Sequence, residues 1–281
     1  MRKNVDDSMI IDTHVHYFNP KNKECWAANR MAEFEARGIK FVEISIDCFD
    51  IDNMAAVITK YSSCLGVVLG EHPKQVTADL DIEKVFVHVR ERLEIYKDHA
   101  LGIKTGLDYY RVEDDRARWK QRKLLRMFLE CAKDEKLPVI LHVRSHEDKS
   151  ADADKDMLSV LSETQFKGKM VLHCFSGDRE LASRYLAGNE NTYFGIGGVL
   201  TYPDCSGLTE AIKEIPRDRI LLETDGPYMK PFYPDGTRTA GKKNSSLHLP
   251  VIIDKIAAVL GISPKEVEDL TTKNACEFYG G

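Results

Sequence analysis

Eight short apolar runs recur along the chain, and the stretches between them have the period of helices. Runs of valine, isoleucine and leucine on successive positions are typical of strands that are covered on both faces. Strands that alternate with helices predict a parallel sheet, and eight repeats predict its closure into a (β/α)8 TIM barrel. The expected strands are residues 9–13, 40–46, 65–69, 101–105, 138–143, 169–173, 192–196 and 219–223.

The expected helices fill the spaces between these runs. In residues 119–135, for example, apolar side chains recur at helical spacing along one face. An open, doubly wound sheet is the alternative fold, but it usually carries a glycine-rich phosphate loop after its first strand, where this chain has Asp-Thr-His-Val-His. The helices are expected at 25–37, 50–61, 81–96, 119–135, 155–162, 179–187, 205–213, 246–260 and 264–279.

The size and composition favour a single domain over residues 1–281, since such barrels typically use about 250 residues. A formal net charge of −5 argues against non-specific adhesion to nucleic acid or to an anionic membrane. The seven cysteines are scattered and form no CxxC pair, which argues against a disulfide framework and a thiolate zinc site. No apolar run reaches about 18 residues, and the first residues do not resemble a signal peptide. We therefore expect a cytoplasmic protein with no membrane partner.

Chemically useful side chains follow the predicted strands at the end where TIM barrels form their active sites. His14 and His16 are two residues apart, so on an extended strand both point to one side. One such histidine is weak evidence, but four histidines and an aspartate at four strand ends predict a divalent-metal site. Asp225 is expected to act as a ligand, as a base on metal-bound water, or as both, and Glu223 to orient water or a ligand. The expected metal ligands are His14, His16, His142, His173 and Asp225.

The motifs at these strand ends resemble those of the TatD family of metal-dependent deoxyribonucleases, within the amidohydrolase-like TIM barrels. The resemblance implies one or two divalent ions (Mg, Mn or Zn) held by the residues just named. It also implies that His72 and the region of Arg144 and Lys243 contact the substrate phosphate. The matching segments are DTHVH at 12–16, EHP at 71–73, TGLDYY at 105–110, LPVILHVR at 137–144, VLHCFSG at 171–177, YFGIGG at 193–198, LLETDGPY at 221–228 and GKKN at 241–244.

Lys104 departs from the family pattern, which has a metal-bridging glutamate two residues before the glycine of GLD. An ammonium group has no lone pair to offer a metal. Three outcomes are open: Lys104 is carboxylated and bridges two metals, as a lysine does in related barrels of the phosphotriesterase type; it stays cationic beside one metal and contacts phosphate; or the site is degraded. Whether Glu71, unusual before His-Pro, reaches the same cation is also open.

The leading functional hypothesis is a hydrolase that cleaves phosphodiester bonds at DNA ends by metal-activated water. The loop at 227–244 contains Lys230, Arg238, Lys242 and Lys243 against Asp235, and it would supply the positive potential that the acidic chain lacks. One alternative is a small-molecule hydrolase, acting on a lactone, amide or phosphotriester, with a carboxylated Lys104 bridging two metals. Another is a metal-poor, non-catalytic barrel subunit of a larger assembly.

Overall fold

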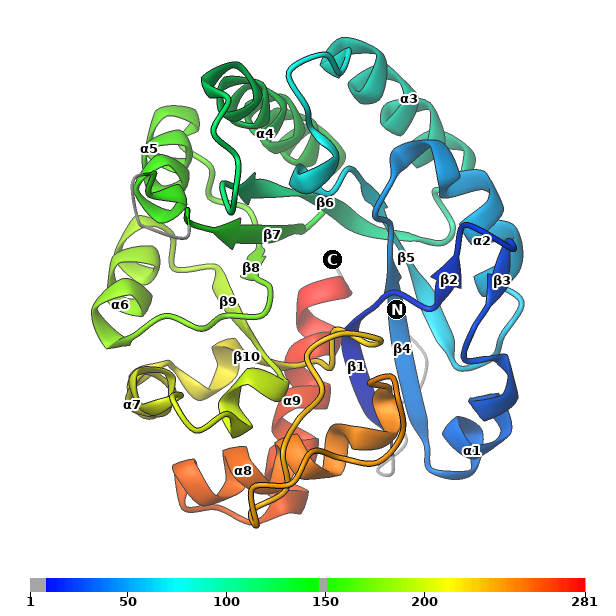
Figure 1. Ribbon diagram of the computed structural model, residues 1–281, viewed down its shortest axis with the longest axis vertical. Coiled ribbons are helices and arrows are strands. Elements are labelled where there is room, and N and C mark those ends of the chain that lie inside the picture. The colour runs from blue at the N-terminus through cyan, green and yellow to red at the C-terminus, as the bar shows by residue number, and fades with distance from the viewer. Residues whose placement is uncertain (1–8, 147–150, 281) are drawn as a thin grey trace.

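Eight parallel strands form one sheet in the order β1-β4-β5-β6-β7-β8-β9-β10. The computed structural model describes residues 9–146 and 151–280. Figure 1 shows the strands as a ring that the helices surround. The strands are β1 (Ile10–Val15), β4 (Ile39–Ile44), β5 (Cys64–Gly70), β6 (Ala100–Asp108), β7 (Val139–Arg144), β8 (Met170–Leu172), β9 (Thr192–Ile196) and β10 (Ile220–Leu222). The predicted (β/α)8 barrel is confirmed, and every expected strand overlaps an observed one.

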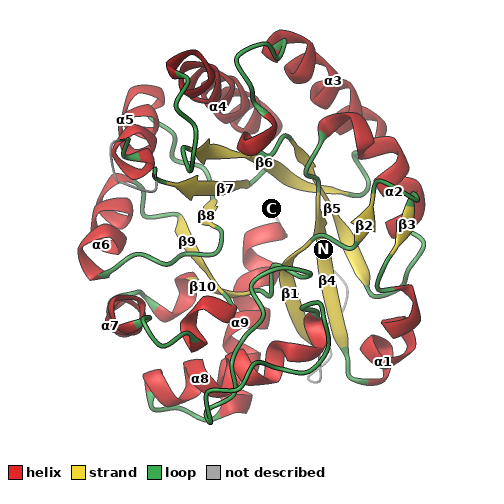
Figure 2. Ribbon diagram, viewed as in Figure 1, coloured by secondary structure: helices red, strands yellow, loops and turns green. Residues whose placement is uncertain are grey.

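The helices lie on the outside of the sheet (Figure 2). Two helix starts follow from capping side chains: the Asp114 carboxylate accepts from two backbone N–H groups at the start of α4, and Ser263 and Glu266 form a capping box at the start of α9. The helices are α1 (Met31–Ala36), α2 (Ile51–Ile58), α3 (Ile82–Ile95), α4 (Asp115–Glu135), α5 (Ala153–Thr164), α6 (Arg179–Gly188), α7 (Ser206–Glu214), α8 (Leu249–Leu260) and α9 (Pro264–Tyr279).

The first helix is shorter than the sequence predicts. Instead of a helix over residues 25–37, the chain forms a small antiparallel pair, β2 (Phe18–Asn19) with β3 (Glu24–Cys25), before α1 begins. The indole N–H of Trp26 donates to the carbonyl oxygen of His16 over 2.9 Å. These tertiary contacts at the end of β1 override the local helical pattern.

The barrel closes between the ends of β1 and β10. The N–H of Asp225 donates to the carbonyl of His14 over 3.0 Å, and the N–H of His16 donates to the carbonyl of Gly226 over 2.7 Å. The buried Asp12 carboxylate strengthens this seam, because it accepts hydrogen bonds from both the N–H and the hydroxyl of Thr224. The seam therefore brings the predicted ligands of the first and last strands together.

Helix α9 covers the opposite end of the barrel, and its C-terminal end lies near the centre of the ring in Figure 1. Phe278 and Tyr279 pack with side chains that fill the barrel interior, among them Ile11 and Val68. The Tyr279 hydroxyl donates to the carbonyl of Thr13 over 2.9 Å. This end is closed by apolar packing, which leaves the carboxyl ends of the strands as the open face.

No single helix within residues 9–146 and 151–280 is both long and apolar enough to cross a membrane. Helices α8 and α9 together reach that length and apolarity, but they are bent by 103° relative to each other.

Candidate metal centre

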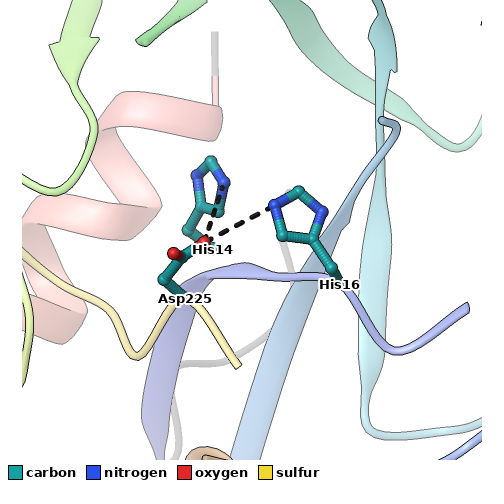
Figure 3. Close-up of side chains that lie close together, drawn as sticks. All are labelled: His14, His16 and Asp225. Carbon is teal, nitrogen blue, oxygen red and sulfur yellow. Dashed lines mark ion pairs between the residues drawn. The ribbon is translucent and has the colours of Figure 1, made fainter. Parts of the chain in front are cut away.

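His14, His16 and Asp225 converge at the mouth of the barrel, where the seam between β1 and β10 closes (Figure 3). The Oδ1 atom of Asp225 lies 3.8 Å from Nε2 of His14 and 3.5 Å from Nε2 of His16. The three side chains are largely buried, and one ligand atom from each lies within 4.8 Å of the others. Asp225 reaches this position with a left-handed backbone, φ 55°, directly after β10.

The hydrogen bonding and the lowered pKa of both imidazoles suit binding of a cation. His16 donates Nδ1–H to the carbonyl of Ile44 over 2.8 Å, which leaves the Nε2 lone pair facing Asp225. The buried Nε2 of His14 has no hydrogen-bond partner among the described residues. Burial lowers the pKa of His16 to about 3 and that of His14 well below its ordinary value. Both rings are therefore neutral near pH 7, as metal ligation requires.

His173, which follows β8, adds a third imidazole to the group. Its Nε2 lies 3.5 Å from Oδ1 of Asp225, and its ring stacks on that of His14 with centroids 3.4 Å apart. On the other side of the ring, Nδ1 lies 2.9 Å from Oε1 of Glu223, although the two are not aligned for a hydrogen bond. Glu223 also accepts from the N–H of Cys174 over 2.6 Å. Glu223 thus contacts the ring and the backbone that follow β8.

Asp225 is the carboxylate on which the three Nε2 atoms converge. Burial raises its pKa, and the nearby charge of Lys104 opposes that rise. One carboxylate oxygen among neutral imidazoles is a donor set that suits a borderline divalent ion such as zinc, manganese or iron. The residues present therefore fit a divalent cation at this point.

His142, the remaining predicted ligand, lies at the edge of this group. Its Nε2 contacts Oδ2 of Asp108 at 3.0 Å, and its ring centroid lies 6.2 Å from that of His173. The ring of His72 packs against it, with centroids 4.3 Å apart, and Nδ1 of His72 accepts from the N–H of Lys74. His142 and His72 thus form a second pair of imidazoles beside the first cluster.

Lys104 lies on β6 and is fully buried. Its Nζ atom has no hydrogen-bond partner among the described residues. Burial lowers the pKa of Lys104, while the negative charges of Asp225 and Glu223 oppose that shift. The lysine in turn contributes to the lowered pKa of His14, His16 and His173. A buried amine therefore lies within electrostatic reach of the three histidines.

Glu71 follows β5, and its carboxylate contacts the loop after β4. Its Oε2 accepts from the N–H of Cys48 over 2.7 Å, and its carboxylate clusters with Asp47 and the Cys48 thiol. Burial raises the pKa of Glu71 to about 7. The Glu71 carboxylate is therefore engaged by the loop after β4 and is not among the groups that cluster with Asp225.

The two predicted phosphate contacts each lie against an aromatic ring. The exposed guanidinium of Arg144 lies 3.6 Å from the ring centroid of Tyr110, at the end of β7. The ammonium of Lys243 lies 4.6 Å from the centroid of Trp26, whose indole bonds the backbone of His16. Both cations thus lie near the strand ends that carry histidines.

Sequence reasoning missed two buried aspartates. Asp108 is the contact of His142, and Asp12 holds Thr224 beside Asp225. Both were visible as the acidic residues of the DTHVH and TGLDYY motifs, and Asp108 ends its strand. Their roles depend on which strands are neighbours across the barrel, which the motifs alone do not give.

The same strand-end motifs place the chain among known proteins. A family model described as TatD related DNase matches residues 11–280. The chain belongs to the TatD family. YabD of Bacillus subtilis, an uncharacterized metal-dependent hydrolase, is 28% identical over 273 residues, which cover 96% of this chain and 99% of YabD. YcfH of Escherichia coli, with the same description, is 30% identical over 213 residues, 75% of this chain and 72% of YcfH.

The fold agrees with that of a solved TatD homologue. The crystal structure of YJJV from Escherichia coli superposes with a TM-score of 0.81 at 23% identity, covering 98% of this chain and all of the other. This protein is therefore a metal-dependent hydrolase of the TatD family, with a candidate metal site at the mouth of its barrel.

Proposed function

We propose that this TatD-family protein hydrolyses phosphodiester bonds at DNA ends, with a divalent cation held by His14, His16 and Asp225. The observation that carries the proposal is the convergence of neutral imidazole Nε2 atoms on one carboxylate oxygen at the barrel mouth. A divalent cation held there would supply positive charge to the phosphoryl oxygens and would lower the pKa of water from about 15.7 toward about 7.

Asp225 is the proposed proton acceptor. Its Oδ1 atom is the oxygen nearest the imidazoles, which would leave Oδ2 to take a proton from the attacking water. Glu223 contacts His173 and the backbone of Cys174, which favours an orienting role over direct proton transfer.

Positive groups around the site are the proposed phosphate contacts. Arg144 presents an exposed guanidinium stacked on Tyr110, a combination that also suits a nucleobase or a single strand. Lys243 completes this positive set, and His72, whose pKa is lowered by burial, would add a neutral imidazole at the neighbouring strand end. Lys104, as an ammonium, would attract phosphoryl oxygens from inside the mouth, at the point where a second metal ion would otherwise supply the charge.

The second candidate is hydrolysis of a small lactone, amide or phosphotriester, with Lys104 carboxylated and bridging two metals. The buried, unpartnered Nζ of Lys104 favours it, because burial promotes the neutral amine that combines with carbon dioxide. The rings of His142 and His173 would then share the second metal. Intact-mass measurement on native protein distinguishes the two candidates, since the adduct adds the mass of one carbon dioxide.

The direct test is release of nucleotides from an end-labelled single-stranded oligonucleotide with Mg²⁺ or Mn²⁺, run beside lactone, amide and phosphotriester substrates. We expect cleavage of the oligonucleotide that stops when the metal is chelated. The matched variant is Lys104→Glu, which restores the family carboxylate. If only this variant cleaved DNA and wild type did not, the nuclease proposal would be wrong.

A further inference from the structure

A cavity of about 140 Å³ opens beside His16, between the ends of β1 and β4 and the first turns of α2. His16 and Ile44, which share the Nδ1–H hydrogen bond, both line it. The cavity therefore adjoins the candidate metal site and is separate from the group formed by His14, His173 and Glu223.

The size of this pocket suits one flat ring. A cavity of about 150 Å³ in another protein takes up a benzene molecule. Apolar residues supply part of the wall here, including Phe18, Pro20 and Met54. A single aromatic or heteroaromatic ring can therefore fill the space with apolar contacts on its faces.

The charge of the pocket excludes a phosphate. Two of its lining residues, Asp47 and Asp50, are aspartates, and none of the described residues that line it is a lysine or arginine. An anion here would meet negative charge with no compensating cation. The group that enters is thus a different part of the substrate from the one that Arg144 and Lys104 attract.

The acidic side chains that line the pocket can accept further hydrogen bonds. Glu43 is buried, which raises its pKa to about 8, and its two oxygens already accept from the N–H groups of Tyr17 and Phe18, so it adds little negative charge near pH 7. Asp47 accepts from the N–H of Phe49 through Oδ1, and Asp50 makes no capping hydrogen bond at the start of α2. A ring that carries N–H donors complements this lining.

We infer that the pocket beside His16 binds an amino-bearing nucleobase and makes the protein prefer cytosine to thymine at the cleaved end. The inference rests on the proposed function. Cytosine presents an amino donor at the position where thymine presents a carbonyl acceptor next to its methyl group. The acidic lining attracts the first and repels the second.

The first experiment compares single-stranded oligo-dC, oligo-dT and oligo-5-methyl-dC of equal length as substrates. We expect kcat/KM for oligo-dC to exceed that for oligo-dT on the order of tenfold. The 5-methyl-dC substrate should behave like oligo-dC, because it keeps the amino group and gains only the methyl group. Equal cleavage of oligo-dC and oligo-dT, or 5-methyl-dC behaving like oligo-dT, would overturn the inference.

The matched variants are Asp47→Asn and Asp50→Asn, separately and combined. Asparagine caps a helix as well as aspartate does, so Asp47→Asn keeps the turn that Asp47 caps. We expect the combined variant to bring the ratio between oligo-dC and oligo-dT close to one. Asp79→Asn, which changes an exposed aspartate outside the pocket, should leave the ratio unchanged. An unchanged ratio in the combined variant would overturn the inference.

A second measurement keeps this test independent of hydrolysis. Calorimetric titration with deoxycytidine and thymidine, which carry no phosphate, measures nucleoside binding apart from cleavage. Deoxycytidine should bind more tightly than thymidine, and the combined variant should lose this binding. That result supports the pocket even if no oligonucleotide is cleaved. In that case only the nuclease proposal fails. If the protein cleaves DNA but binds the two nucleosides equally well, the nuclease proposal is retained and the proposed preference for cytosine is wrong.

Discussion

The backbone N–H of Asp225 donates to the carbonyl oxygen of His14 over 3.0 Å, so the hydrogen bond that closes the barrel also fixes the distance between two proposed metal ligands. The next seam bond, from the N–H of His16 to the carbonyl of Gly226, does the same for the second histidine. Because these bonds use backbone atoms, replacing a ligand side chain leaves the seam in place. Ligand variants can therefore report on metal binding without unfolding the chain.

Lys104 is expected to destabilise the metal-free protein. Burial lowers its pKa in the folded state, so between that pKa and the value of about 10.4 for an unfolded lysine, only the unfolded chain binds the proton. Stability therefore rises with pH across this window. At pH 7 we expect Lys104→Met to be more stable than wild type by on the order of 1–3 kcal/mol in urea unfolding.

The difference in the free energy of unfolding between wild type and Lys104→Met should become smaller when urea unfolding is measured near pH 10. Lys155→Met, at an exposed position of α5, is the control and should show no such pH-dependent gain. A Lys104→Met protein that is less stable than wild type at every pH would show that the amine has favourable partners in the fold.

Variants of Glu223 test whether this residue orients His173 or transfers a proton in the reaction. Glutamine keeps an oxygen that can accept from the N–H of Cys174 and contact His173, so we expect Glu223→Gln to retain activity within about tenfold. Glu223→Ala removes the contact and should weaken metal affinity by about 10–100-fold. If Glu223→Gln lost activity by about 100-fold or more while binding metal normally, Glu223 would be the catalytic base instead.

Arg144 should affect substrate binding more than the chemical step. Its guanidinium is exposed at the end of β7 and stacks on Tyr110. We expect Arg144→Ala to raise KM for an oligonucleotide several-fold, to lower the dependence of KM on salt, and to change kcat little. Arg37→Ala, at an exposed position of the loop after α1, is the control. A fall in kcat at unchanged KM would place Arg144 in the chemistry.

The sequence predicted the barrel because each buried strand contains its own apolar run, and the barrel repeats that pattern eight times. It was wrong about the start of the helix expected at 25–37, where the bond from Trp26 to His16 and the pairing of Cys25 with Phe18 of β2 replace the first turns. The contact of Trp26 is non-local, so no local pattern shows it.

The candidate site was also predictable in part, where residues share one strand. His14 and His16 lie on one strand, so their common direction follows from the period of two. The meeting of Asp225 with both depends on barrel closure, which eight repeats imply. The contacts of Asp108 with His142 and of Glu71 with Cys48 depend on side-chain directions across different strands, and those were not available from spacing.

The most direct test of the central claim is the number and affinity of Mn²⁺ ions bound per chain, measured by calorimetry for wild type and Asp225→Asn. The account predicts an ion in wild type whose affinity falls by more than about 100-fold in the variant, with the fold intact by circular dichroism. Wild-type affinity should also fall as the pH drops, because burial raises the pKa of Asp225 and protons then compete for its carboxylate. Equal affinity in both proteins would contradict a metal site at His14, His16 and Asp225.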